Sequence, residues 1–189
     1  MKKVIFLISA LVITIISIFV AKPYVEAYQE RQKYEFTLDT IDGEIKLSDY
    51  RGKAVAIYFG FMYCPDACPT SLALLSESLK DFSKEQVDAF QGIFISVDPD
   101  RDSLKDLKEY GAYFDKSIIG TTGKKNDLKK IAKNYGTYYV LEKSSPEDKL
   151  YNVAHTSYFY IFDKQGNLST KLRGFTSPSE ITEALKKVL

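Results

Sequence analysis

Apolar residues form short continuous runs along this chain, alternating with segments of helical spacing. Residues 54–61 and 92–97 are two such runs, rich in β-branched and aromatic side chains, which predicts strands buried on both faces. Leu72, Leu75 and Leu79 follow the first run at helical spacing. Further helices are predicted over 103–114, 124–135 and 179–188. This alternation predicts an α/β sheet with crossover connections.

The other apolar segments predict shorter strands. Residues 36–47 are typical of a β-hairpin with its turn at Asp42-Gly43. Strands are also predicted over 118–120, 138–141, 158–162 and 168–172, with a turn at 164–167 and a polar loop over 142–152. The closing strand–turn–strand–helix order predicts a mixed sheet with an antiparallel edge.

The N-terminus carries a candidate membrane segment. Residues 4–21 contain no charge and follow two lysines. Such a run approaches the roughly 20 residues that a helix needs to cross a bilayer. Because basic residues stay in the cytoplasm, we predict a cytoplasmic end at 1–3, an anchor at 4–21, a polar linker at 22–33 and one domain at 34–189. The domain would then lie on the periplasmic or extracytoplasmic side of a bacterial cytoplasmic membrane, held there by a single span.

A cleaved signal peptide is the alternative interpretation. The apolar run exceeds the about 7–15 residues usual for such a peptide, and the best cleavage site, Val25-Glu26-Ala27, lies well beyond it. Both interpretations export the domain. The formal net charge of +1 argues against binding to nucleic acid.

The chain has two cysteines, Cys64 and Cys68, and one histidine, His155. Two thiols and one imidazole suit a single soft metal ion such as copper or zinc. The cysteines follow the predicted strand 54–61 and precede a helix. Backbone N–H groups at such a junction favour a thiolate, which both metal binding and thiol exchange require. A central strand that leads into a cysteine pair and a helix is the layout of a thioredoxin-like fold.

Two prolines surround Cys68. Pro69 suits the first position of a helix, which would place Cys68 near the cap and Cys64–Ala67 in a turn. Ideal helical spacing puts the two Cβ atoms about 5–6 Å apart, whereas a disulfide requires about 3.8 Å. A turn relaxes that limit, so reversible oxidation stays possible. A purely structural disulfide is the alternative, although so short a loop gains little stability from it.

His155 and Asp98 each have an ordinary structural interpretation. A lone histidine beside a strand commonly serves only as a hydrogen-bonding residue. Within 98–103, Pro99 would end a strand, and Asp102 or Ser103 would cap the next helix. The functional alternative makes His155 a metal ligand and Asp98, at the end of the predicted strand 92–97, a polar group beside the metal site.

Three ordered motifs together resemble the Sco/SenC family of membrane-anchored copper proteins. They are Gly60-Phe61 followed by Cys64-Pro65-Asp66-x-Cys68-Pro69, the segment Ser96–Asp102, and His155 before an aromatic strand with Asp163-x-x-Gly166. The chain departs from the family at Met62 and Tyr63, which lie outside the ligand set.

The resemblance implies a copper site of Cys64, Cys68 and His155 that takes Cu(I) and Cu(II). It implies a metallochaperone, not primarily an enzyme, that matures the dinuclear copper centre of cytochrome c oxidase. The implied partners are the copper-bearing oxidase subunit and a copper donor protein. The family alternative is a thiol–disulfide reductase that acts on the cysteines of that subunit through Cys64 and Cys68.

Other site chemistries fit less well. General disulfide exchange usually uses Cys-x-x-Cys with a cis-proline, and the loop before the strand 158–162 contains no proline. A peroxidase would carry an activating threonine where this chain has Phe61. A structural zinc site needs four ligands, so an additional carboxylate would have to complete the three Cys and His side chains.

Overall fold

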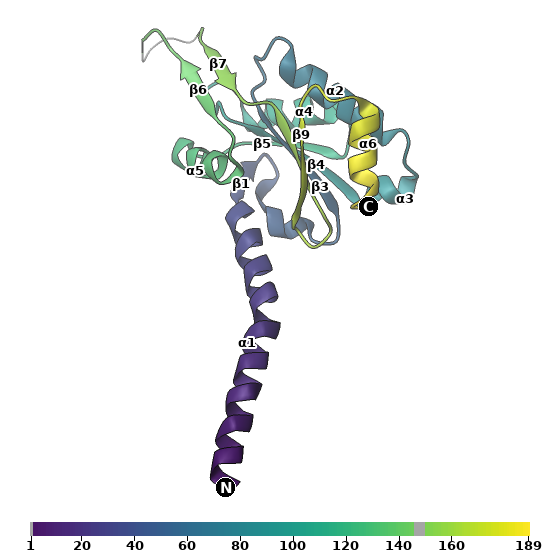
Figure 1. Cartoon of the computed structure of the whole chain (residues 1–189). Helices are drawn as coiled ribbons and strands as arrows, with labels where there is room; N and C mark the ends of the chain where they lie inside the picture. The colour runs from purple at the N-terminus through teal and green to yellow at the C-terminus, as the bar shows by residue number, and fades with distance from the viewer. Residues whose placement is uncertain (1, 146–149) are drawn as a thin grey trace. The chain divides into compact units, whose positions relative to one another are not determined.

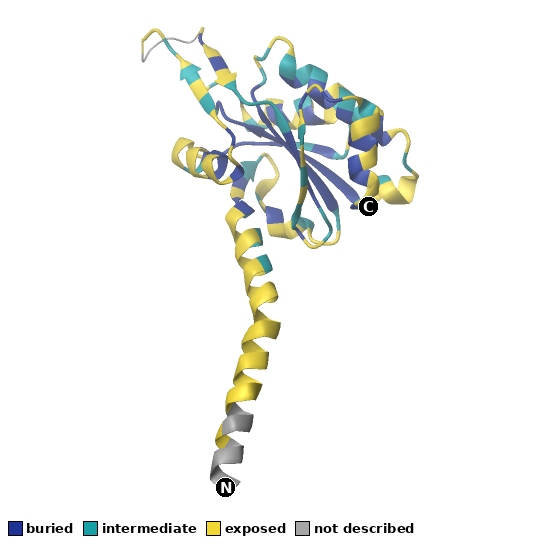
Figure 2. Ribbon diagram, viewed as in Figure 1, coloured by how far each residue is buried: buried dark blue, intermediate teal, exposed yellow. Residues whose placement is uncertain are grey.

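The computed structural model describes residues 2–145 and 150–189. It divides the chain into two compact units, 1–33 and 34–189. The first unit is almost entirely helix α1 (Lys2–Tyr34), in which the stretch Leu11–Tyr34 is long and apolar enough to cross a membrane. Its apolar side chains over 11–20 are exposed (Figure 2). Residues 22–33, predicted as the linker, continue this helix.

The second unit is built on a five-stranded sheet (Figure 1). Across the sheet, the strands are β5 (Ile118–Thr121), β4 (Phe90–Ser96), β3 (Ala54–Gly60), β8 (Tyr158–Phe162) and β9 (Leu168–Arg173). β3, β4 and β5 are mutually parallel, whereas β8 runs antiparallel to β3, and β9 to β8. The predicted mixed sheet with an antiparallel edge is therefore confirmed, and Figure 2 shows its strands as the buried centre of the unit.

Two hairpins stand outside this sheet. β1 (Thr37–Thr40) and β2 (Gly43–Lys46) form the predicted N-terminal hairpin, but the turn residues are Ile41 and Asp42. Gly43 instead opens β2 with a φ of 123°, a conformation that favours glycine. The second hairpin pairs β6 (Tyr139–Glu142) with β7 (Asn152–His155) and projects from the sheet (Figure 1). Sequence analysis predicted no strand at β7.

The helices cover both faces of the sheet. They are α2 (Ala67–Leu79), α3 (Lys84–Asp88), α4 (Leu104–Phe114), α5 (Lys125–Tyr135) and α6 (Pro178–Lys186), with a 3-10 turn η1 (Leu47–Tyr50). Successive residues of β3 point to opposite faces. Tyr58 lies within hydrogen-bonding distance of Ser71 of α2, at 3.2 Å, whereas the Phe59 ring packs on Tyr135 of α5. Accordingly, α2 and α5 cover opposite faces, and α4 and α6 pack beside α2.

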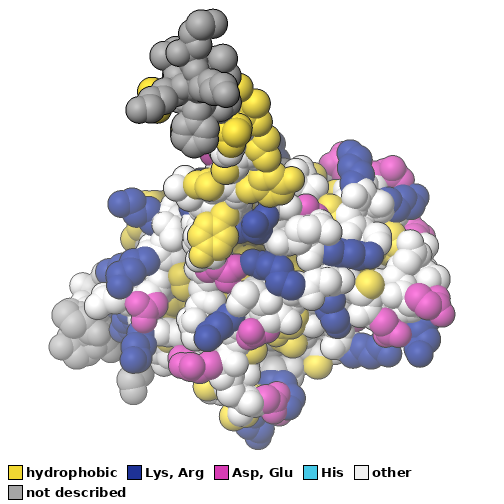
Figure 3. Space-filling view, turned by 90° about the horizontal axis from the view of Figure 1, so that it is seen from below, with side chains coloured by type: hydrophobic (Ala, Val, Ile, Leu, Met, Phe, Trp, Pro, Cys, Tyr) yellow, Lys and Arg dark blue, Asp and Glu magenta, His cyan; other side chains and the backbone are white. Residues whose placement is uncertain are grey.

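Charges of both signs are mixed on the domain surface. In Figure 3, Lys and Arg side chains lie among Asp and Glu side chains, while exposed apolar side chains gather on α1. On the face drawn there, neither sign of charge forms a large continuous area.

Candidate metal centre

The buried strand β3 delivers the cysteine segment to one end of the sheet. Cys64 lies in the loop after β3, and Cys68 in the first turn of α2. The helix begins at Ala67, so the prediction that it begins at Pro69 is wrong. Pro69 is its third residue, where the missing N–H costs nothing because the first four N–H groups of a helix have no partner within it.

The hairpin β6–β7 delivers the imidazole. His155 is the last residue of β7 and pairs with Tyr139 of β6. With its proton on Nδ1, the ring donates to the Thr156 carbonyl at 3.2 Å. This tautomer leaves the Nε2 lone pair free, 3.4 Å from the Cys68 sulfur. The ring also meets the edges of Phe61 and Tyr58, which fix its position from the side of the sheet.

The structure thus brings the three predicted side chains together. The two sulfurs and one ring nitrogen of Cys64, Cys68 and His155 all lie within 4.8 Å of one another, and both thiols are free. Cys68 is buried, whereas Cys64 and His155 are partly exposed. Two sulfurs and one nitrogen at this separation are positioned to bind a soft metal ion that is reached from the solvent side.

The two thiols differ in acidity. The Cys68 thiol donates a hydrogen bond to the Cys64 sulfur, and this bond, aided by backbone N–H groups, lowers the pKa of Cys64 to about 3. The Cys68 N–H lies 3.4 Å from that sulfur. Conversely, the same hydrogen bond together with burial raises the pKa of Cys68. At neutral pH the pair therefore holds one thiolate, on Cys64, and one proton, on Cys68.

This asymmetry predicts the alkylation of the metal-free protein by iodoacetamide. Cys64 should react at a constant rate from pH 8 to pH 5, because its thiolate persists down to a pKa of about 3. An ordinary thiol has a pKa of about 8.5, and below this pKa its reaction slows roughly tenfold per pH unit because the thiolate fraction falls. Mass spectrometry of the modified peptide measures the rate. In Cys68→Ala, which removes the side-chain donor, the steep pH dependence should return; a steep dependence in the unaltered protein would contradict the prediction.

Gly60 makes room for the Cys68 sulfur. A Cβ at this position would lie 2.7 Å from Cys68 Sγ and 2.7 Å from the Phe94 ring. We expect Gly60→Ala to lower the free energy of unfolding by about 1–3 kcal/mol through overpacking and to weaken metal binding by displacing the sulfur.

Gly92→Ala is the matched control for this prediction. Gly92 lies in β4, and its Cβ would meet Ile118 of the neighbouring strand β5 at 2.7 Å, away from the thiols. Denaturant unfolding and copper titration of both variants should show similar losses of stability, with weaker copper binding only in Gly60→Ala. Equal copper affinity in the two variants would contradict the role given to Gly60.

Asp98 lies outside the three-residue cluster. Its carboxylate is fully buried and is engaged by Arg101 Nε at 2.5 Å and by the Tyr151 hydroxyl at 2.5 Å. Arg101 also donates to the Tyr151 carbonyl at 2.7 Å, and its guanidinium lies 3.7 Å from the centre of the Tyr151 ring. Since Tyr151 directly precedes β7, this group fastens the start of the strand that ends at His155. We call Asp98, Arg101 and Tyr151 the Arg101 clamp.

Arg101 and its neighbour also contact the cysteine loop. The guanidinium lies 5.0 Å from the centre of the Tyr63 ring. Asp102 accepts hydrogen bonds from the Met62 N–H at 2.9 Å and from the Ser96 hydroxyl at 2.6 Å. Ser103 caps α4, as one of the two predicted alternatives has it, by accepting from the Asp106 N–H. The sequence does not reveal that Arg101, Asp102 and Tyr151 organise the site. Arg101 and Asp102 do fall within the motif Ser96–Asp102, which could have drawn attention to them.

A family profile described as SCO1/SenC matches residues 25–189 of this chain. The chain belongs to the SCO1/SenC family. A SCO2-like protein of Rickettsia felis is 35% identical over 165 residues, covering 86% of this chain and 80% of that protein. The predicted family and the thioredoxin-like fold that it implies are confirmed.

Solved structures of Sco proteins superpose well on this chain. Bradyrhizobium japonicum ScoI, solved with copper bound, has 33% identity and a TM-score of 0.71, covering 82% of this chain and 98% of that one. BsSco has 23% identity and a TM-score of 0.62, covering 82% and 91%. The description of BsSco names a disulfide switch and a Sco family of cytochrome c oxidase assembly proteins. Copper is thus the metal found in a Sco relative of this chain.

Proposed function

We propose that this protein binds copper through Cys64, Cys68 and His155 and passes it to the copper-bearing subunit of cytochrome c oxidase, whose dinuclear centre it matures. The observation that carries the proposal is the approach of the three donor atoms to within 4.8 Å of one another. A copper donor protein supplies the ion. In this role copper is cargo, and the protein is an assembly factor.

The donor set fits copper better than zinc. Two sulfurs and one nitrogen satisfy the low coordination number of Cu(I), and the imidazole also suits Cu(II). A structural zinc site needs four ligands, and within the described residues the cluster has three. Binding requires both sulfurs as thiolates, so copper displaces the proton that Cys68 holds in the metal-free pair.

Partial exposure of the site supports transfer. Cys64 and His155 are reached from solvent, whereas Cys68 is buried. A thiolate of the receiving subunit approaches the ion on the exposed side and forms a bond to it as the bond to Cys64 breaks. Repeated exchange moves the ion without releasing it into water.

The direct test loads the full chain in detergent with Cu(I) and mixes it with the soluble domain of the oxidase subunit. We expect copper to leave this protein and to appear in that domain, as measured by metal analysis after separation. Absence of transfer, combined with reduction of a disulfide in that domain by the metal-free protein, would favour the reductase alternative.

The reductase alternative has its own physical support in the Cys64 thiolate. This sulfur would attack a disulfide of the oxidase subunit and form a mixed disulfide. That attack releases one thiolate of the subunit. Cys68, once deprotonated, would then attack the Cys64 sulfur and release the second thiolate of the subunit, leaving Cys64 and Cys68 joined as a disulfide.

His155 should matter more for Cu(II) than for Cu(I). We expect His155→Ala to weaken Cu(II) binding by about tenfold or more, by analogy with the 10–100-fold effects of altered metal surroundings, and Cu(I) binding by less, because the two thiolates remain. Competition titrations with a chelator specific for each oxidation state measure both affinities. An unchanged Cu(II) spectrum in this variant would remove His155 from the ligand set.

The proposed location is the outer face of a bacterial cytoplasmic membrane, with α1 as the single anchor. The apolar stretch of α1 and the basic residues before it support this arrangement. A protease added to intact spheroplasts should digest the domain at 34–189. Protection of the domain from that protease would contradict the orientation.

A further inference from the structure

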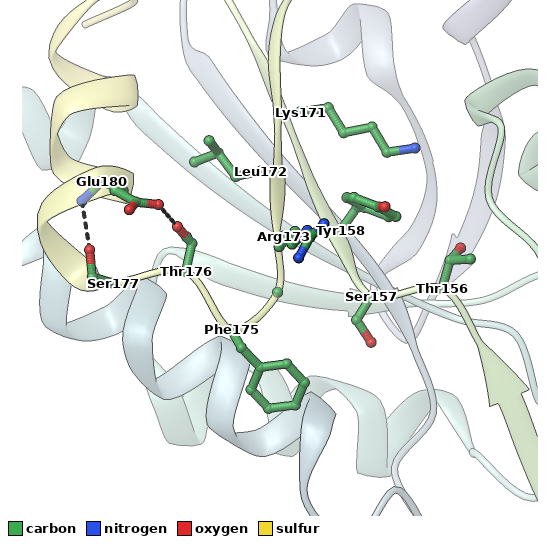
Figure 4. Close-up of a pocket in the computed structure, with 11 residues that line it drawn as sticks. Thr156, Ser157, Tyr158, Lys171, Leu172, Arg173, Phe175, Thr176, Ser177 and Glu180 are labelled. Carbon is green, nitrogen blue, oxygen red and sulfur yellow. Dashed lines mark hydrogen bonds between the residues drawn. The ribbon is translucent and has the colours of Figure 1, made fainter.

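A second feature lies directly beside the metal centre. A pocket of about 720 Å³ opens between the segment that follows His155 and the end of β9, and Figure 4 shows its lining side chains. The lining includes Thr156, Ser157, Lys171, Arg173, Phe175 and Glu180. Because the imidazole of His155 contacts the carbonyl of Thr156, a lining residue, at 3.2 Å, the pocket and the metal centre adjoin.

Tight contacts fix the walls of this pocket. The Gly174 N–H donates to the Ser157 carbonyl at 2.9 Å, which joins the loop after β9 to the segment that carries His155. A Cβ on Gly174 would lie 2.7 Å from the hydroxyl of Ser71 in α2, the helix that carries Cys68. The pocket is thus held in place by the same elements that hold the metal ligands.

The pocket presents positive charge. Lys171 and Arg173 alternate along β9, are exposed, and form no ion pair within the described part of the chain. Figure 4 shows both side chains on the same side of β9 as Tyr158, which belongs to the neighbouring strand β8. The Lys171 ammonium is held 4.0 Å from the centre of the Tyr158 ring, and no carboxylate of residues 2–145 or 150–189 forms an ion pair with it.

The acidic residue of the pocket does not neutralise these charges. Glu180 accepts a hydrogen bond from the Thr176 hydroxyl (Figure 4) and lies in the first turn of α6, whose N–H groups offset its charge. Beside the two cations, the Phe175 side chain is 57% exposed. Two uncompensated cations and an exposed aromatic ring suit a segment that combines carboxylates with an apolar side chain.

We propose that this pocket docks an acidic segment of the protein that receives the copper, with its carboxylates at Lys171 and Arg173 and an apolar side chain against Phe175. This inference rests on the proposed function and specifies the chemistry of its partner. The pairs form at the rim of the site, so they mainly raise the association rate and orient the receiving thiolates toward Cys64 and His155.

The test compares two double charge reversals in the full chain in detergent. Lys171→Glu with Arg173→Glu alters the pocket; Lys129→Glu with Lys133→Glu makes the same charge change at exposed positions of α5. The probe is the soluble domain of the oxidase subunit. Binding to the metal-free protein is measured by biolayer interferometry, and transfer is measured from the Cu(I)-loaded protein.

We expect the pocket variant to bind copper as the unaltered protein does but to associate with the probe and transfer copper about tenfold more slowly, an effect that shrinks as salt screens the charges. The α5 variant should match the unaltered protein. If the two variants associate with the probe and transfer copper at equal rates, whether unchanged or equally slowed, the docking proposal is overturned while copper transfer stands.

If the unaltered protein itself neither binds the probe nor transfers copper, the proposed function fails and the docking proposal fails with it. Should the pocket variant bind no copper, Lys171→Gln with Arg173→Gln replaces it under the same criteria.

Discussion

Replacing Cys68 by serine is expected to weaken Cu(I) binding by more than about 100-fold, since altered outer groups around a metal alone cost about 10–100-fold. A hydroxyl is a hard, neutral donor and does not replace a thiolate toward Cu(I). Cys64→Ser should have an effect of the same order, because both sulfurs belong to the cluster. The measurement is competition for Cu(I) against a chelator of known affinity, with the full chain in detergent.

Ser71→Ala is the control for these cysteine variants. Its hydroxyl is buried beside the cluster and lies 3.2 Å from the Tyr58 hydroxyl, but it supplies no ligand. Copper affinity should therefore stay close to that of the unaltered protein. Retention of tight Cu(I) binding in both serine variants of the cysteines would end the assignment of this site.

The largest loss of stability is expected from Arg101→Met. Methionine keeps the apolar stem but leaves the fully buried Asp98 carboxylate without its cation. Removing one member of a buried ion pair costs about 3–5 kcal/mol. Denaturant unfolding of the full chain in detergent, followed by near-ultraviolet circular dichroism, measures the change.

A double variant separates the ion pair from simple packing. Asp98→Asn combined with Arg101→Met removes both charges, so it should be less destabilised than Arg101→Met alone. If Arg101→Met lowered the free energy of unfolding by less than about 1 kcal/mol, the pair of Arg101 with Asp98 would contribute no more than an exposed ion pair on the surface does. A double variant as unstable as the sum of the single variants would show that the pair does not couple.

The strands of the core were predictable because their apolar runs are continuous. Residues 54–61 and 92–97 correspond closely to β3 and β4, and the position of the cysteines after β3 follows from that. By contrast, β7 has only four residues, Asn-Val-Ala-His, of which just Val153 is buried, and its pairing with β6 makes it a strand. The short helix α3 was also missed, although Ser83 and Gln86 form a capping box that signals its start.

The sequence predicts the candidate metal ligands of the site but not the residues that hold those ligands in place. The chain has so few Cys and His residues that composition singled out the three candidates, and the resemblance to the Sco/SenC family joined them in one site. The Arg101 clamp joins side chains about fifty positions apart, as in the hydrogen bond from Arg101 to the Tyr151 carbonyl, and no local pattern encodes such a contact. The preference of proline for the first helical position predicts a helix that begins at Pro69, but proline is tolerated throughout the first turn, and α2 begins at Ala67.

In the proposed function, the Arg101 clamp and the bound copper hold opposite ends of one short strand, β7. When copper departs, the imidazole end loses its bond while the tyrosine end stays fastened to the body of the domain. The empty protein consequently retains its nitrogen donor on a tether of only a few residues, so recapturing an ion carries a small entropic cost. Such an arrangement suits a carrier that must be emptied and refilled many times without refolding.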